Sequence, residues 1–449
     1  MIIVLIVLIV FYSICFLDPS IKEDVFYLSI PFVYWVTTIY YLFKYKIKNL
    51  FCFELFFAIS YYLCSFLTRF FLPLLNAYES RAFINDSTLI YKAYALSIMG
   101  YLCYMLGLIV RRKPTTLIER KTNHFYFPQI SNRSNMLANV FCTFFIVLMF
   151  LNGGSRLFTM YSDEGSFSTN RLSGFAAYLT FAIITYIVSI VTNFGSISKN
   201  VKQIHFLSLR NTFSVLFIIN SIILIGTFLL SGYRSNAIQI LIPLVIAYQI
   251  RFKPIKPALV LLLLMGGAFL MFFIGIVRTG DTFNLNDYSL IVYLRDFKPA
   301  NAATIYMIAY ADQHGVTGGS NMLFPILSII PGLQSIVGLF VDINTVSPVS
   351  SVFFTKAFSS DSGFGTSITG DLYYTFGYIG VLVLMYLYGR CLSRLSQYKN
   401  KYELVLFLSF SGNALFAPRV EFCYIIRSLA WSVIFLYLII NLSKNKANG

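Results

Sequence analysis

The chain has 449 residues, of which 58% are hydrophobic and only 12% are charged, and its mean hydropathy is +0.74. Because a soluble domain carries about twice that share of charged residues, this composition excludes an ordinary soluble enzyme. The formal net charge of +16 would suit a nucleic-acid partner. However, the basic residues stand at the ends of apolar segments and form no single patch, so nucleic-acid binding is excluded as well.

Apolar runs recur along the whole chain, and each is long enough for a membrane-spanning helix, which needs roughly 17–25 mostly apolar residues. The first run is interpreted as a retained span and not as a signal peptide, because it lacks a preceding basic region and a small-residue cleavage site. We predict an all-α polytopic membrane protein with about 12 transmembrane helices in one integral membrane domain. The predicted spans are residues 2–17, 25–43, 51–75, 87–110, 136–151, 174–194, 212–230, 235–250, 258–277, 372–390, 402–417 and 424–442.

The basic residues predict how these helices are oriented. Cytoplasmic segments of membrane proteins are enriched in Lys and Arg, and here basic clusters follow every second span, beginning with KYKIK at 44–48 and RRKPTTLIERK at 111–121. Most of the acidic residues fall on the opposite side. We therefore predict cytoplasmic N- and C-termini, and we interpret the net positive charge as mainly a topology signal.

One connection on the outer side is much longer than the others. It covers residues 278–371 and begins with VRTGD at 277–281, and connections of this length are usually functional. Within it, a second apolar run at 322–340 is broken by two prolines and a glycine. Because these breaks argue against a regular span, we expect this run to lie in the membrane interface or to re-enter the membrane from outside.

Arg234 stands between two apolar runs in the segment TFLLSGYRSNAIQILIPL, within the first turn of the predicted span 235–250. Ser231, Ser235 or Asn236 would cap this helix. A helix N-terminus carries partial positive charge and free N–H groups, so the arginine meets a field of its own sign. Two interpretations stay open. Arg234 binds an anion such as a phosphate together with the helix end, or it only extends its head group to the membrane surface.

Further charged candidates lie at the outer ends of other helices. Arg278 ends the span before the long loop, where the helix dipole already favours a cation, and Asp281 is close enough in sequence to orient it. Arg419 and Arg427 flank the start of the last span, with Glu421 between them. An ionisable residue within an apolar zone suggests a functional site, and a structural ion pair with Glu421 is the alternative.

The remaining candidates belong to outer loops. Arg156 and Arg171 lie in the loop 152–173, which is either a ligand-binding surface or an ordinary surface of mixed charge. His314 suits proton transfer near neutral pH, although a lone loop histidine is often incidental. Asp371 either supplies a base or caps the tenth span, and we favour the cap.

No residue pattern in the sequence indicates a metal or an organic cofactor. The 7 cysteines form no CxxC pair and the 3 histidines are scattered, so neither a disulfide framework nor a zinc site is expected. The sequence also lacks a Walker motif and a DxD motif. Several arginines instead share the outer side, which predicts metal-free handling of a phosphorylated ligand at the outer interface.

Two stretches of the chain resemble a known family. The segment LLSGYRSNAIQILIPLVIAYQ at 229–249, followed by a long outer loop that opens with VRTGD, is similar to the oligosaccharide repeat-unit polymerases of the Wzy type, which make O-antigen or capsular polysaccharide. The segment GFGTSITGDLYYTFGYIGVLVLMYLYG at 363–389 resembles the same family. The resemblance is best from the seventh to the tenth span, and the N-terminal part matches only in hydropathy.

This resemblance implies a GT-C-like membrane glycosyltransferase of the bacterial inner membrane, which acts at the periplasmic face without metal. Donor and acceptor would both be glycans on undecaprenyl diphosphate, and the growing chain would move en bloc to an acceptor sugar hydroxyl. A chain-length regulator would be a further partner. The family's outer-loop arginines correspond to Arg234 and Arg278, which we expect to stabilise the charge that develops on the leaving diphosphate.

The other candidates take supporting roles in this interpretation. Arg427 would assist at the diphosphate, and a proton acceptor would be needed at the acceptor hydroxyl. The expected diphosphate- or glycan-binding residues are Arg427, Arg419, Arg156 and Arg171, and the expected proton acceptor is His314 or an outer aspartate such as Asp281.

Three alternative functions stay open. A lipid-linked oligosaccharide flippase would place ionisable residues along a central cavity and show two related halves, whereas the charge here lies at outer helix ends. An O-antigen ligase, which moves glycan onto the lipid A core, shares the predicted geometry. A non-enzymatic membrane scaffold would tolerate the loss of every outer arginine.

Overall fold

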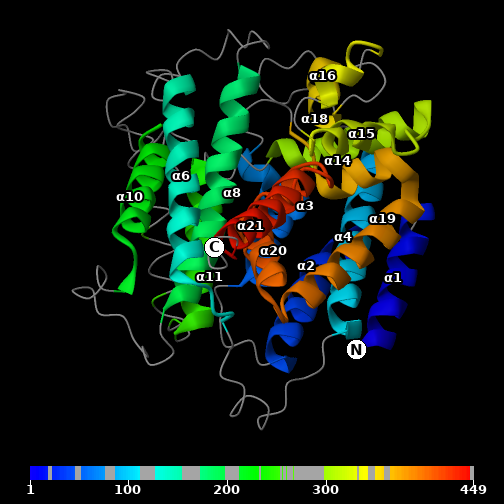
Figure 1. Ribbon diagram of the computed structural model, residues 1–449. Helices are drawn as coiled ribbons and strands as arrows, with labels where there is room; N and C mark the ends of the chain where they lie inside the picture. Colours follow the sequence, from blue (N-terminus) through cyan, green and yellow to red (C-terminus); the bar gives the residue numbers. More distant parts are fainter. Residues whose placement is uncertain are drawn as a thin grey trace, which may run out of the picture.

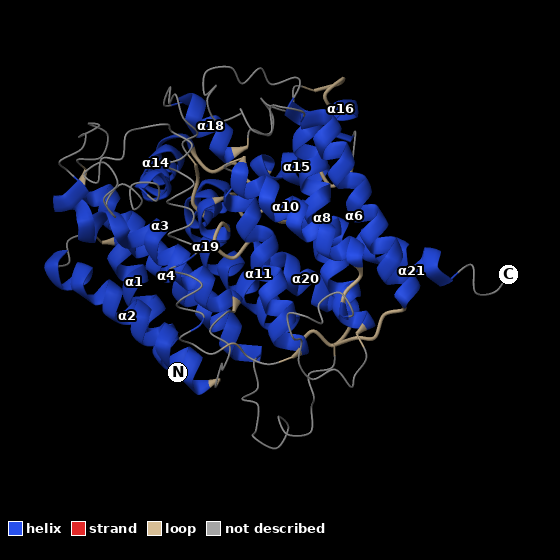
Figure 2. Ribbon diagram, turned by 90° about the vertical axis from the view of Figure 1, so that its left-hand side faces the viewer, coloured by secondary structure: helices blue, strands red, loops and turns tan. Residues whose placement is uncertain are grey.

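The protein, in a computed structural model, consists of helices joined by turns and loops, and no strand occurs in the residues that the structure describes (Figure 1, Figure 2). This confirms the predicted all-α fold. The described residues are 1–18, 23–45, 52–75, 86–111, 127–153, 172–197, 212–231, 234–252, 255, 259, 266, 298–330, 333–341, 349–357 and 365–444.

Each predicted span within the described part coincides with a helix, and the predicted span 258–277 lies almost wholly outside it. The structure describes 6 helices that are long and apolar enough to cross a membrane, which is the pattern of a polytopic membrane protein. The matched helices are α1 (Ile2–Leu17), α2 (Glu23–Lys44), α3 (Phe53–Leu75), α4 (Ser87–Arg111), α6 (Asn132–Gly153), α8 (Leu172–Ser196), α10 (Val215–Leu230), α11 (Arg234–Arg251), α19 (Ile368–Leu395), α20 (Lys401–Gly412) and α21 (Ile426–Lys444).

Helices α4 and α19 approach each other more closely than side chains would allow. A Cβ atom on Gly107 would lie 2.1 Å from the carbonyl oxygen of Tyr386, and one on Gly389 would lie 2.1 Å from the carbonyl oxygen of Tyr104. Small residues at such contacts let two membrane helices pack backbone to backbone. Gly107 and Gly389 therefore fix the C-terminal half of α19 against α4.

Buried tyrosines join α2, α3 and α4 into one layer. The rings of Tyr34 and Tyr101 stack with centroids 3.8 Å apart. The hydroxyl of Tyr34 donates to the Ala58 carbonyl at 2.6 Å, and that of Tyr61 donates to the Ser97 carbonyl at 2.7 Å. Each ring thus buries an apolar body while its hydroxyl finds a backbone acceptor in the neighbouring helix.

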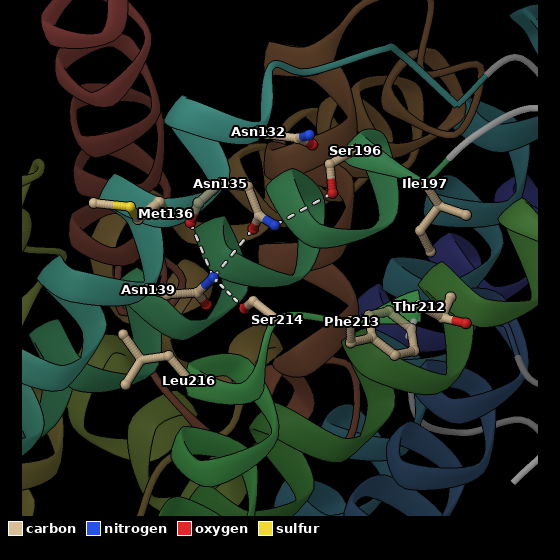
Figure 3. A pocket seen from close by; sticks show the side chains of 10 residues that line it. All are labelled: Asn132, Asn135, Met136, Asn139, Ser196, Ile197, Thr212, Phe213, Ser214 and Leu216. Atoms are coloured by element: carbon tan, nitrogen blue, oxygen red, sulfur yellow. Dashed lines mark hydrogen bonds between the residues drawn. The ribbon is translucent and has the colours of Figure 1, made fainter. Parts of the chain in front are cut away.

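A second layer contains α6, α8 and α10, and uncharged polar side chains hold it together. Asn139 of α6 donates to Ser214 Oγ at 2.8 Å and accepts from Asn193 Nδ2 of α8 at 3.1 Å. Asn135 of α6 donates to Ser196 Oγ at 3.2 Å. Of these residues, Asn135, Asn139, Ser196 and Ser214 border a cavity of about 500 Å³ (Figure 3). Because the buried amides satisfy one another, the cavity's polar lining acts as interhelical glue.

Where the structure describes it, the long predicted loop is largely helical. Its helices are α14 (Lys298–His314), α15 (Ser320–Leu327), α16 (Leu333–Val337) and α18 (Ser350–Ala357). They gather at the end of the bundle opposite the N-terminus, at the top of Figure 1. The apolar run 322–340 does not form one continuous helix: α15 has only 8 residues, and at about 1.5 Å per residue it is too short to cross a bilayer.

Candidate functional site

The candidate site is built on a turn between α20 and α21, residues 413–427, which is called the arginine turn below because it carries Arg419 and Arg427. Its start is held by close packing. A Cβ on Gly412 would lie 2.5 Å from the carbonyl oxygen of Gln239 in α11, and Gln239 Nε2 donates to Asn413 Oδ1 at 3.3 Å. Arg419 then follows in a short 3-10 helix, Ala417–Arg419. The turn is thus anchored on α11.

Arg427 lies in the first turn of α21 and is half-buried. Its guanidinium carbon is 5.6 Å from the ring centroid of Phe181 in α8, a cation–π contact. Its Nε atom is buried and has no hydrogen-bond partner in the described part of the chain. Buried donors in folded proteins are nearly always paired, so this one suits an acceptor that belongs to a bound ligand.

The alternative interpretation of Arg427, an ion pair with Glu421, is wrong for the described residues. Glu421 Oε1 instead accepts the backbone N–H of Ser351 at 3.1 Å, at the start of α18. A carboxylate is favourable there because helix N-termini carry partial positive charge. Glu421 therefore connects the arginine turn to α18 and leaves the guanidinium of Arg427 available.

Asp371 does not cap α19, contrary to the prediction. Ser367 is the N-cap, and its side chain accepts from the backbone N–H of Gly370. Asp371 lies one turn further on and is 1% exposed. Its Oδ1 accepts from Ser350 Oγ at 2.5 Å, and its Oδ2 accepts from the backbone N–H of Phe422 at 3.0 Å. The carboxylate thus joins α19 to α18 and to the arginine turn.

Helix α19 breaks at Gly377, whose φ of 68° and ψ of −162° are open to glycine and strained for other residues. A break ends one helical segment, and the last carbonyls of a helical segment lack donor partners within it, so they can accept from elsewhere. The backbone N–H groups of Thr317 and Gly318, just before α15, donate to the carbonyls of Tyr374 and Thr375 at 3.0 and 2.9 Å. The glycine-rich entry thereby docks the long loop onto α19.

His314 is the last residue of α14 and is exposed. Its ring stacks on Tyr310 with centroids 4.1 Å apart, and its Nδ1 lies 3.2 Å from the carbonyl oxygen of Tyr310. Tyr310 also contacts Phe353 of α18 at 5.2 Å between ring centroids. His314 is therefore connected through Tyr310 to α18, and Glu421 connects α18 to the arginine turn. His314 and the arginine turn thus lie at the same end of the bundle.

The start of α11 also lies at this end, because Gln239 near its start contacts Asn413. Arg234 is the first residue of α11, so Ser235 and Asn236 lie inside the helix and do not precede it as caps. Ser231 ends α10, and its buried Oγ has no partner among described residues. The other sequence candidates, Arg278, Asp281, Arg156 and Arg171, lie outside the described residues.

Cys423, in the arginine turn, is 4% exposed. Burial raises the pKa of its thiol to about 12, and the nearby carboxylates of Asp371 and Glu421 act in the same direction. A raised thiol pKa disfavours the thiolate, so this environment argues against Cys423 as a nucleophile. Among the described residues, no three His, Cys, Asp or Glu side chains come together in a way that could hold a metal ion.

Three comparisons with known proteins bear on this geometry. A family model described as O-antigen polysaccharide polymerase Wzy matches residues 1–447. No curated protein and no solved structure matches the chain. Since the family model covers nearly the whole chain, the resemblance predicted from the glycine-marked stretches is confirmed.

Proposed function

Because the chain belongs to the O-antigen polysaccharide polymerase Wzy family, we propose that it joins oligosaccharide repeat units carried on undecaprenyl diphosphate at the periplasmic face of the bacterial inner membrane. The growing glycan is the donor, and a single lipid-linked repeat unit is the acceptor. A hydroxyl of the acceptor sugar attacks the anomeric carbon of the donor, the whole chain moves en bloc, and undecaprenyl diphosphate leaves. A chain-length regulator is a proposed partner.

The unpaired Nε of Arg427 is the observation that carries this proposal. Departure of the lipid diphosphate builds negative charge on the leaving oxygen, and a fixed guanidinium stabilises that charge more in the transition state than in the ground state. Arginine forks are well suited to phosphate oxygens. Arg419 lies on the same turn, so we assign both arginines to the diphosphate.

Arg234 and Arg278 join them in this proposal. The described contacts of α11 support the assignment of Arg234, because they bring its helix start to the arginine turn. Arg156 and Arg171 are proposed to bind the glycan or the diphosphate. With cationic side chains neutralising the diphosphate, the reaction needs no metal.

The proton acceptor is proposed to be His314 or Asp281. His314 is exposed at the end of α14 and is linked through Tyr310 and α18 to the arginine turn. A general base needs access to the acceptor hydroxyl, and the exposure of His314 supports it in that role.

The proposed membrane arrangement follows the charge pattern. We infer a GT-C-like bundle of about 12 spans with cytoplasmic termini, so that α14 to α18 lie on the periplasmic side. Leu339 and Phe340, in the turn that follows α16, are 81% and 82% exposed. Such exposed apolar side chains support an interfacial position for the segment 322–340.

Purified protein incubated with lipid-diphosphate repeat units tests the proposal directly. We expect a ladder of polymer that survives EDTA. A ladder that EDTA abolishes and Mg²⁺ restores would contradict the metal-free mechanism. Transport of the lipid-linked unit across vesicles without any ladder would favour a flippase, and transfer only to the lipid A core would favour a ligase.

A further inference from the structure

We propose that Asp371 is a positioning residue that clamps the arginine turn, so that Arg419 and Arg427 are held where the donor diphosphate binds. This inference rests on the proposed function for the role of the arginines. The clamp consists of one carboxylate that contacts three segments lying far apart in the sequence.

The first contact is the bond that holds the turn. The backbone N–H of Phe422 donates to Asp371 Oδ2 at 3.0 Å. Phe422 lies between Arg419 and Arg427, so the bond fixes the backbone midway between the two arginines. Glu421, the residue before Phe422, adds a second contact. Its Oε1 accepts the backbone N–H of Ser351 at the start of α18.

The second and third contacts connect the clamp to the long loop. Ser350 Oγ of α18 donates to Asp371 Oδ1 at 2.5 Å, and Asn321 Nδ2 of α15 donates to the same atom at 3.2 Å. Asn321 also donates to Thr375 Oγ1 at 2.8 Å and accepts from Thr317 Oγ1 at 2.7 Å. The loop helices and the arginine turn therefore form one hydrogen-bonded unit around Asp371.

The environment of Asp371 argues against an ordinary stabilising ion pair. The residue is 1% exposed, and the only ion pair between residues with described placement joins Lys92 to Asp312 at 3.3 Å. Burying a carboxylate without a cation costs free energy unless several donors satisfy it. An aspartate at this position is explained by the need to accept three donors from three directions.

The same burial excludes contact between Asp371 and the substrate. All three of its donors come from the protein, and 1% exposure leaves no path to an acceptor hydroxyl. Its effect on the reaction must therefore pass through the arginine turn.

Cys423 provides a direct readout of the clamp. It follows Phe422 and is 4% exposed, so its thiol reacts with a labelling reagent only when the turn opens. The test uses a protein that keeps Cys423 and has its other cysteines replaced by serine. In this protein we expect Asp371→Ala to raise the labelling rate of Cys423 by about 10-fold or more, because the turn loses a hydrogen bond to a buried charged group. Asp371→Asn keeps the shape and loses one acceptor, so its labelling rate should be intermediate. Unchanged labelling in both variants would overturn the clamp.

A mutant cycle then separates positioning from general stability. If Asp371 acts through the two arginines, adding Asp371→Ala to a variant that already carries Arg419→Ala and Arg427→Ala should cause no further loss of polymer, measured per folded protein in the membrane. An independent, multiplicative loss would show that Asp371 does not act through these arginines. Full polymerisation by Arg427→Ala, with Cys423 still exposed by Asp371→Ala, would refute the proposed function of the arginine and leave the clamp standing.

Discussion

Replacing Arg427 with alanine should impair polymerisation far more than folding. The folded protein loses a cation–π contact with Phe181, worth about 0.5–2 kcal/mol. It loses no hydrogen bond at Nε, because that atom has no partner among described residues. In the proposed mechanism the transition state loses a fixed charge beside the leaving diphosphate, and removing one such group typically lowers a rate by about 100- to 1,000-fold.

The substitution Arg427→Lys sharpens this prediction. Lysine keeps the positive charge and loses the planar fork that matches phosphate oxygens. We therefore expect activity between that of the wild type and Arg427→Ala. Arg390→Ala is the matched control. Arg390 lies near the C-terminal end of α19, away from the arginine turn, and donates to Tyr386 Oη at 3.0 Å. It should retain long polymer.

The assay is the glycan pattern on a gel from cells that express each variant, normalised to the protein inserted in the membrane. Arg427→Ala should display glycan capped at one repeat unit. A full ladder from Arg427→Ala at normal protein levels would refute the assignment of Arg427 to the diphosphate. Loss of the ladder in Arg390→Ala as well would show that the assay reports folding and not the site.

Three further predictions concern other parts of the chain. Arg234→Ala and Arg278→Ala should each leave only glycan with a single repeat unit while the protein still inserts, and long ladders in both would contradict their role. Gly389→Leu should destabilise the bundle by about 3 kcal/mol or more through overpacking, because even a Cβ there meets a backbone oxygen at 2.1 Å; its measured readout is protein recovered from the membrane. Gly226→Ala is its control, since a Cβ there meets nothing within 4 Å, and equal losses of both proteins would disprove the packing argument. His314→Ala should slow the purified reaction by about 100-fold or more if His314 is the general base; an unchanged rate at every pH tested would transfer that role to an aspartate such as Asp281.

The membrane helices were predictable because hydropathy is a local property. A run such as 87–110 contains all the information needed to identify α4. The same reasoning missed α14, because Lys298–His314 mixes polar and apolar residues and its burial depends on α3, α4 and α19. The interruption of the run 322–340 was predictable from its prolines and glycine, and the structure places a break there between α15 and α16.

The role of Asp371 was not predictable from neighbouring residues. Its position near the start of a span favoured a cap, but Ser367 takes that place one turn earlier. The true donors, Asn321, Ser350 and Phe422, are 50, 21 and 51 positions away in the sequence. Only the folded chain brings them to one carboxylate, and the unpaired Nε of Arg427 is likewise a property of the fold.

The stretch that carried the resemblance, 363–389, now has a physical interpretation. Gly389 at its end permits the close contact with α4, and Gly377 in its middle breaks the helix so that the long loop can dock on the freed carbonyls. Asp371 near its start binds the arginine turn. The stretch therefore fixes α19 in the bundle with one end and holds the loop and the arginine turn with the other. This explains why a motif without a single arginine would accompany the proposed arginine-based chemistry.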